Sequence, residues 1–184
     1  MVPEARQVEL VAADGTPAGV SNVVDAHTAP GQLHRAFSVL LIDSAGRTLL
    51  QQRAAIKSRF ALRWANACCG HPAPRENVTT AATRRLAEEL GVRGVALHEV
   101  GVYAYRAPDE SSGLIEHEYD HVLIGRCDND LTLSPDPSEV AATRWVGLAD
   151  LASTGVAEAE KNYAPWLAGV LSVALHSTHL SDIR

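Results

Sequence analysis

One stretch of the chain is apolar at almost every position and constrains the fold more than any other. It reads Ala36-Phe37-Ser38-Val39-Leu40-Leu41-Ile42 and leads into the turn residues Asp43-Ser44-Ala45-Gly46. A strand with one face in water alternates apolar and polar side chains, whereas an unbroken apolar run is typical of a strand covered on both faces. We therefore expect a central strand with layers of structure on either side, and a return strand over residues 48–52.

The other segments predict several strands and a few helices. Strands are expected over residues 8–12, 18–24, 95–105, 116–125 and 140–146. One helix is expected over residues 77–90, ended by Gly91 in the C′ position. Another is expected from Pro165 onward, where apolar residues recur at helical spacing. Because strands and helices do not alternate regularly, the pattern predicts an α+β sandwich.

Composition limits the class of protein. The 184 residues suffice for one buried core, so we expect a single domain over residues 1–184. A formal net charge of −6 argues against a nucleic-acid partner, and no apolar run approaches the ~20 residues of a membrane span. Three cysteines, two of them adjacent, do not form a disulfide framework and favour a cytoplasmic setting. The sequence carries no signal for the oligomeric state.

One loop and the helix after it contain residues that a protein core does not need. The loop reads Asn66-Ala67-Cys68-Cys69-Gly70-His71-Pro72, and the helix ends with Glu88-Glu89 in its last turn. Acidic side chains are unfavourable there because they face the negative end of the helix dipole. One interpretation is a pair of surface salt bridges, since Arg84 and Arg85 precede the two glutamates by four residues.

The spacing within this segment gives a second interpretation. It resembles the signature of the Nudix superfamily, carried here by Gly70, Glu76, Arg84, Leu86, Glu88, Glu89 and Gly91. In that superfamily the late glutamates hold a divalent cation against a diphosphate. Its hydrolases carry a glutamate where this chain has Arg85, so Arg85 favours binding a diphosphate without cleaving it.

A further set of residues has the composition of a metal site, namely His27, His34, His71, Glu116 and Glu118. Glu116 and Glu118 are two residues apart, so on a strand both side chains project from one face. Neighbouring carboxylates repel unless a cation lies between them or one is protonated. The whole set suits Mn²⁺, Zn²⁺ or Mg²⁺. Taken singly, each histidine is better explained as a surface or core residue.

Segments 27–38, 66–72 and 116–118, together with the glutamate-bearing helix, resemble type I isopentenyl diphosphate isomerases over about residues 7–170. The resemblance implies a Nudix-like mixed-sheet α/β/α sandwich with a catalytic core of about residues 27–170. It also implies interconversion of isopentenyl and dimethylallyl diphosphates, in which an alkene is protonated and a neighbouring carbon deprotonated through a tertiary carbocation.

The resemblance also implies roles for individual residues. Cys69 and Glu118 match the family's catalytic cysteine and glutamate, in an order of proton transfer that the sequence leaves open. Tyr105 matches a tyrosine that hydrogen-bonds near the glutamate, and Trp166 one whose ring faces the carbocation. Arg53 and Lys57 match diphosphate contacts, to which Arg85 is added. The three histidines with Glu116 and Glu118 would hold one divalent metal, and Glu89 would lie beside a second, Mg²⁺.

Two departures from the family pattern leave alternatives open. A diphosphate-binding lysine is replaced by Val23, and a Pro-Gly loop by the segment over residues 59–63, where Arg59 or Arg63 is a candidate replacement for the lost contact. The chain could therefore act on a longer prenyl diphosphate by the same chemistry, by isomerisation or cyclisation. Further alternatives are a Nudix diphosphate hydrolase and a binding domain without activity.

Overall fold

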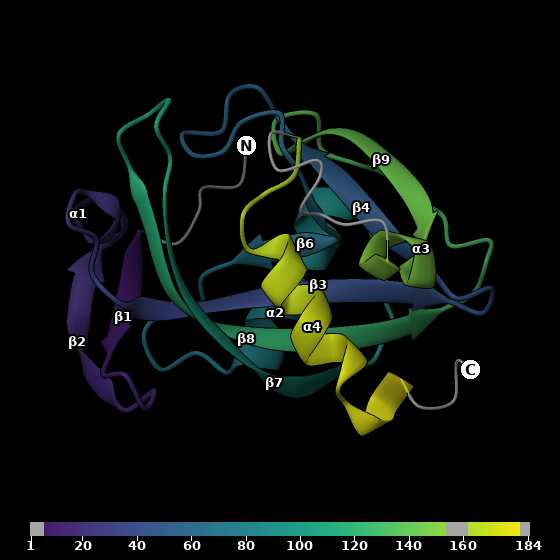
Figure 1. The fold of residues 1–184 in the computed structure, drawn as a ribbon, viewed down its shortest axis with the longest axis horizontal. Helices are drawn as coiled ribbons and strands as arrows, with labels where there is room; N and C mark the ends of the chain where they lie inside the picture. Colours follow the sequence, from purple (N-terminus) through teal and green to yellow (C-terminus); the bar gives the residue numbers. More distant parts are fainter. Residues whose placement is uncertain (1–5, 154–161, 181–184) are drawn as a thin grey trace.

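The structure is a computed structural model that describes residues 6–153 and 162–180 (Figure 1). Its strands are β1 Gln7–Val11, β2 Pro17–Asn22, β3 His34–Asp43, β4 Arg47–Arg53, β5 Trp64–Asn66, β6 Cys68–Gly70, β7 Leu97–Pro108, β8 Ile115–Cys127 and β9 Val140–Gly147. Its helices are α1 Val23–His27, α2 Val78–Leu90, α3 Leu148–Ser153 and α4 Leu167–Leu175, with a 3₁₀ turn η1 over Thr178–Leu180.

Strand β3 is the central strand. It pairs in parallel with β8 from His34 opposite Glu118 to Asp43 opposite Cys127, and antiparallel with β1, β4 and β6. Its side chains alternate between two apolar clusters, with Val39 in one and Leu40 in the other. The prediction of a central strand buried on both faces is confirmed.

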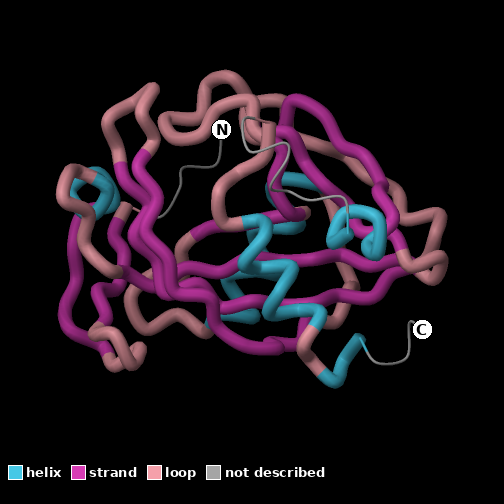
Figure 2. The backbone as a smooth tube through the Cα atoms, viewed as in Figure 1, coloured by secondary structure: helices cyan, strands magenta, loops and turns pink. Residues whose placement is uncertain are grey.

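Helices cover both faces of the curled sheet, as Figures 1 and 2 show. Helix α2 packs on one face through buried side chains that include Leu86 and Leu90. Helix α4 packs on the opposite face through Leu167 and Val170. With one parallel pair among antiparallel ones, this is the mixed-sheet α/β/α arrangement that the sequence predicts.

Three local predictions need correction. The strand expected through Val24 ends at Asn22, because the Asn22 side chain accepts a hydrogen bond from the Val24 backbone N–H at 2.9 Å and starts helix α1. Helix α4 begins at Leu167, so Pro165 lies in the turn before it rather than in its first position. The short strands β5 and β6 and helix α3 are elements that the sequence did not predict.

Helix α2 follows its prediction closely. The Asn77 side chain accepts a hydrogen bond from the Thr80 N–H at 3.0 Å and caps its start, and Gly91 ends it with φ of 71°. The segment 66–72, which contains β6, therefore leads toward a helix that is capped at both ends.

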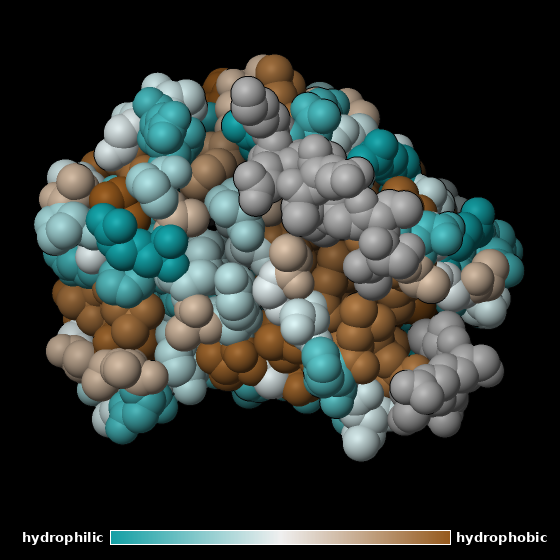
Figure 3. All heavy atoms as spheres, in the orientation of Figure 1, coloured by the Kyte–Doolittle hydropathy of each residue, from teal (hydrophilic) through white to brown (hydrophobic). Residues whose placement is uncertain are grey.

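The surface on the side of α4 mixes polar and apolar side chains (Figure 3). Within the described residues, no helix is both long and apolar enough to cross a membrane.

Candidate active site

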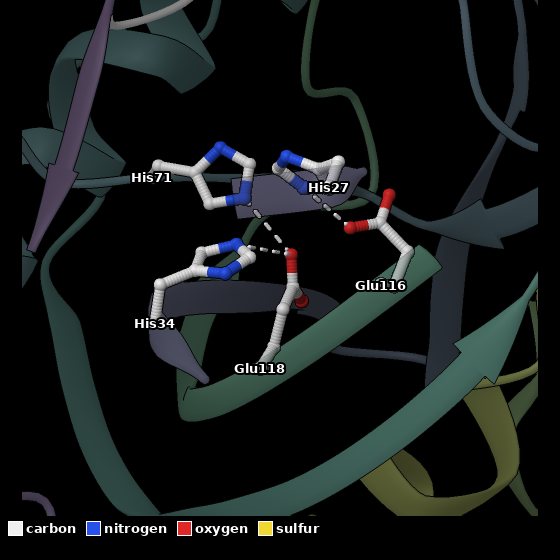
Figure 4. Close-up of side chains that lie close together, drawn as sticks. All are labelled: His27, His34, His71, Glu116 and Glu118. Carbon is white, nitrogen blue, oxygen red and sulfur yellow. Dashed lines mark hydrogen bonds and ion pairs between the residues drawn. The ribbon is translucent and has the colours of Figure 1, made fainter. Parts of the chain in front are cut away.

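Three imidazoles and two carboxylates from four segments of the chain converge at one buried point (Figure 4). His27 ends α1, His34 begins β3, His71 follows β6, and Glu116 and Glu118 lie on β8. One ligand atom from each residue lies within 4.8 Å of the others, and all five residues are buried. The prediction that these five residues come together is confirmed by their geometry.

Strand register explains why these side chains meet. Glu118 on β8 lies directly opposite His34 on β3 and opposite Tyr105 on β7. Residues opposite one another in a sheet project to the same face, and so do residues two apart on one strand. Glu116, two residues before Glu118, therefore joins the same group.

Each of two histidines is oriented by a backbone carbonyl. His27 Nδ1 lies 2.6 Å from the Val23 carbonyl oxygen, and His34 Nδ1 lies 2.8 Å from that of Gln32. The other ring nitrogen, Nε2, then faces the cluster: in His27 it lies 2.8 Å from Glu116 Oε2. A histidine whose outer nitrogen is held in this way is a typical metal ligand.

The protonation state of His34 also suits a metal. Burial, followed by the neighbouring His71 and His27, lowers the pKa of His34 from 6.5 to about 3, so the ring is neutral at physiological pH. Among the described residues, its buried Nε2 has no hydrogen-bond partner, and Glu118 Oε1 lies 3.8 Å away. A neutral imidazole with an unused nitrogen that faces the Glu118 carboxylate fits a divalent cation.

Glu116 is held as a carboxylate. Burial by itself raises its pKa, but the Arg59 guanidinium and the hydrogen bond with His27 outweigh burial and hold the pKa of Glu116 well below its usual range. Arg59 Nε donates to Glu116 Oε1 at 2.7 Å, while the other carboxylate oxygen faces His27. The charge needed to bind a cation is therefore present at neutral pH.

A small cleft lies against this cluster. Its lining includes the predicted catalytic residues and two of the three predicted diphosphate contacts: Cys69, Glu118, Tyr105, Trp166, Arg53 and Lys57. A larger hollow, bordered by Thr83, Arg84 and Glu88, lies along the outer side of α2 and contains none of these six residues. The small cleft is the better candidate because charge, thiol and carboxylates meet there.

Glu118 and Cys69 differ in their surroundings. Glu118 Oε2 accepts a hydrogen bond from the Tyr105 hydroxyl at 2.7 Å, and Glu118 Oε1 lies 2.9 Å from His71 Nε2. Burial, and then the nearby carboxylates of Glu118 and Glu116, raises the pKa of Tyr105 well above its usual value, so its hydroxyl stays a donor. Burial raises the pKa of Cys69 to about 12, against the opposing effect of Arg53, so this thiol carries its proton at neutral pH.

The indole of Trp166 forms an aromatic wall of the cleft. Its Nε1 donates to Asn66 Oδ1 at 3.0 Å, and Phe60 packs edge-on against it with ring centroids 5.4 Å apart. The Arg53 guanidinium lies 5.5 Å from the Trp166 ring centroid, an arrangement that shows this ring face can contact a positive charge.

The glutamates of α2 lie in an ion-pair network. Arg85 donates to Glu88 at 2.9 Å and to Glu89 at 2.6 Å, and it lies 3.2 Å from Glu139. Arg85 is not among the residues that line the small cleft, whereas Arg53 and Lys57 are. Glu139 connects the two regions because its other oxygen lies 2.6 Å from Lys57 Nζ.

The surface salt-bridge interpretation holds for Arg84, which lies 3.5 Å from Glu88 at the exposed side of the helix. Glu89 is different because it is buried. Burial raises its pKa, and the cations of Arg85 and Lys57 oppose that effect. A buried carboxylate is the kind of protein ligand that Mg²⁺ takes when substrate phosphates supply its other ligands.

Sequence reasoning missed three residues of this region. Asn66 fixes the indole of Trp166, and Glu139 pairs with Lys57. Asp120 is fully buried on the same face of β8 as Glu118 and accepts a hydrogen bond from Ser38 Oγ at 2.8 Å. Side chains two residues apart on a strand share a face, so the spacing that groups Glu116 with Glu118 also predicts that Asp120 lies beside them. No local sequence pattern indicates the position of Glu139.

The fold and the matched segment define the class of protein. Residues 32–167 match the family described as the NUDIX domain. A protein of Deinococcus radiodurans, known from a crystal structure, shares the fold with a TM-score of 0.71 and 18% identity, over 90% of this chain and 97% of its own.

Two curated relatives identify the group within that class. The isopentenyl-diphosphate Delta-isomerase of Nocardia farcinica is 59% identical over 167 residues, which are 91% of this chain and 93% of the relative. That of Streptomyces coelicolor is 44% identical over 171 residues, which are 93% of this chain and 84% of the relative. The chain belongs to the isopentenyl-diphosphate Delta-isomerase family of NUDIX-domain proteins.

Proposed function

We propose that this chain is a metal-dependent isomerase that interconverts isopentenyl and dimethylallyl diphosphates. The observation that carries the proposal is the cleft in which a protonated thiol, Cys69, and a carboxylate, Glu118, lie with two cationic side chains against a metal-ligand cluster. The high identity to relatives named for this reaction supports it.

The reaction needs two proton transfers. A proton added to the terminal alkene carbon gives a tertiary carbocation, and loss of a proton from the neighbouring chain carbon gives the product double bond. Cys69 and Glu118 carry these two transfers, each worth about 10²–10⁴-fold in rate. Tyr105 donates to Glu118 and fixes the direction of its carboxyl group.

The carbocation needs a site that excludes water and tolerates positive charge. Trp166 presents its indole to the cleft and is itself buried, so it screens the intermediate from solvent. A cation facing an indole is stabilised by about 2 kcal/mol when both are desolvated.

Two metal ions belong to the proposal. His27, His34, His71, Glu116 and Glu118 would hold a divalent Mn²⁺, Zn²⁺ or Mg²⁺ ion, which would supply Lewis acidity to the Glu118 carboxyl group. A Mg²⁺ near Glu89 would neutralise the diphosphate, which Arg53 and Lys57 would bind by charge-assisted hydrogen bonds. We assign Arg85 to the orientation of Glu89, which it contacts. The three described cysteines are free thiols, which supports action in the cytoplasm.

Incubation with isopentenyl diphosphate and divalent metal in D₂O tests the proposal. We expect dimethylallyl diphosphate that carries deuterium, with no release of inorganic phosphate. Absence of both product and deuterium uptake would refute the isomerase. Faster turnover of ten- or fifteen-carbon diphosphates would favour the longer-chain alternative, and phosphate release that survives Cys69→Ala would favour hydrolysis.

A further inference from the structure

Arg59 is an arginine at the cleft that the proposed mechanism does not yet use. It lies between β4 and β5, its side chain is 8% exposed, and it lines the cleft together with Arg53 and Lys57. A buried guanidinium is costly unless it serves a charged partner. We therefore ask which charged groups the buried Arg59 guanidinium serves.

The side chain of Arg59 reaches the metal-ligand cluster from the cleft side. Its Nε donates to Glu116 Oε1 at 2.7 Å, and the other oxygen of Glu116 lies 2.8 Å from His27 Nε2. Arg59 thus contacts a predicted metal ligand and also borders the space that the substrate would fill.

The loop that carries Arg59 is fixed at several points. The Arg59 carbonyl oxygen accepts hydrogen bonds from Arg53 Nε at 3.2 Å and Nη2 at 2.9 Å. The next backbone N–H, that of Phe60, donates to Asp109 Oδ2 at 2.9 Å. The Arg53 side chain and the Arg59 backbone are therefore fixed to each other, which limits the entropy lost when an anion binds at the cleft.

The charges at the cleft favour an anion at this point. Arg53, Lys57 and Arg59 all border the cleft, and Lys57 and Arg59 each also pair with a glutamate, Glu139 at 2.6 Å and Glu116 at 2.7 Å. A diphosphate carries several negative charges and takes charge-assisted hydrogen bonds from arginine in preference to neutral donors. A divalent cation in the cluster would share the charge of Glu116 and so strengthen the attraction between Arg59 and a diphosphate.

We propose that Arg59 is a diphosphate-binding residue that joins the substrate site to the metal site through Glu116. This inference rests on the proposed function, because it takes the diphosphate from that reaction. Arg59 supplies the third cation of the cleft, beside Arg53 and Lys57.

The test uses the full chain and two variants on one loop. Arg59→Met removes the charge and keeps the apolar stem, whereas Arg63→Met makes the same change four residues away, outside the cleft lining. Inorganic pyrophosphate binding is measured by calorimetry in chelator and with Mn²⁺, and Mn²⁺ affinity is measured separately. We expect Arg59→Met to weaken pyrophosphate binding by about 10- to 100-fold and to raise KM more than it lowers kcat, with Mn²⁺ still bound. Arg63→Met should weaken pyrophosphate binding less than Arg59→Met does, because Arg63 lies outside the cleft lining.

Pyrophosphate binding and KM that are unchanged in Arg59→Met would overturn the proposal. A loss of Mn²⁺ binding with unchanged pyrophosphate binding in chelator would overturn it too, since Arg59 would then act only on Glu116. If Arg59→Met does not fold, Arg59→Lys is used instead, because it keeps the charge but loses the planar guanidinium. A wild-type pyrophosphate affinity in Arg59→Lys would refute a role of the guanidinium in binding. Failure of the wild type to isomerise in D₂O would count against the proposed function, whereas an active wild type with a normal Arg59→Met variant counts only against Arg59.

Discussion

Acidification should destabilise the metal-free protein through His34. The pKa of this ring is lowered from 6.5 to about 3, so in the folded state it stays neutral at pH values where the unfolded chain already binds a proton. Stability therefore falls as the pH drops from about 6.5 toward about 3. Each pKa unit corresponds to about 1.36 kcal/mol, so at pH 5, about 1.5 units below the unfolded value, His34 accounts for a loss of about 2 kcal/mol.

Urea unfolding in chelator at about pH 7 and about pH 5 measures this loss. Other groups titrate in the same interval, so the useful quantity is the difference between the wild type and His34→Gln, which should lack about 2 kcal/mol of the pH dependence. His176→Gln, which removes an exposed histidine at the end of α4, is the matched control and should keep the wild-type dependence. The same pH dependence in the wild type and in His34→Gln would refute the assignment.

Three further predictions address the site and the core. Cys69→Ala should lower isomerisation by about 10²–10⁴-fold in a discontinuous product assay, since a positioned acid or base is lost, while thermal unfolding changes little. Tyr105→Phe removes the hydrogen bond to Glu118 Oε2 and should lower kcat by about tenfold with a smaller change in KM, and an unchanged kcat would contradict its orienting role. Leu86→Ala truncates a side chain of α2 that is 2% exposed and should lower the free energy of unfolding in urea by about 2–5 kcal/mol at constant metal concentration. A decrease below about 1 kcal/mol would show that this helix face is not packed as described.

The sequence predicted the features that repeat along the chain. The apolar run over 36–42 predicted β3, because apolar side chains on both faces of a strand must be buried. The spacing of two residues placed Glu116 and Glu118 on one face of a strand. The three histidines of the metal-ligand cluster come from three other segments, and no local pattern links them to Glu116 and Glu118.

Features that depend on long-range contacts were less predictable. The diphosphate role of Arg85 stays a prediction, and the sequence did not indicate that its guanidinium also contacts Glu139 besides Glu88 and Glu89. Glu139 comes from the start of β9, and no local pattern announces its pairing with Lys57. Helix α1 was missed because a single asparagine cap decides its start, which is a short-range signal that strand propensity concealed.

The parallel pairing of β3 with β8 has a consequence for how the enzyme matures. His34 and Glu118 become neighbours only when two strands far apart in the sequence have joined, and such contacts form slowly because a long loop must close first. A slip of one residue in that pairing would turn Glu118 to the opposite face of the sheet. Newly made chains should therefore acquire metal affinity late, after β3 and β8 have paired. During refolding, the amount of metal bound at each time would report the fraction of molecules in which this pairing has the correct register.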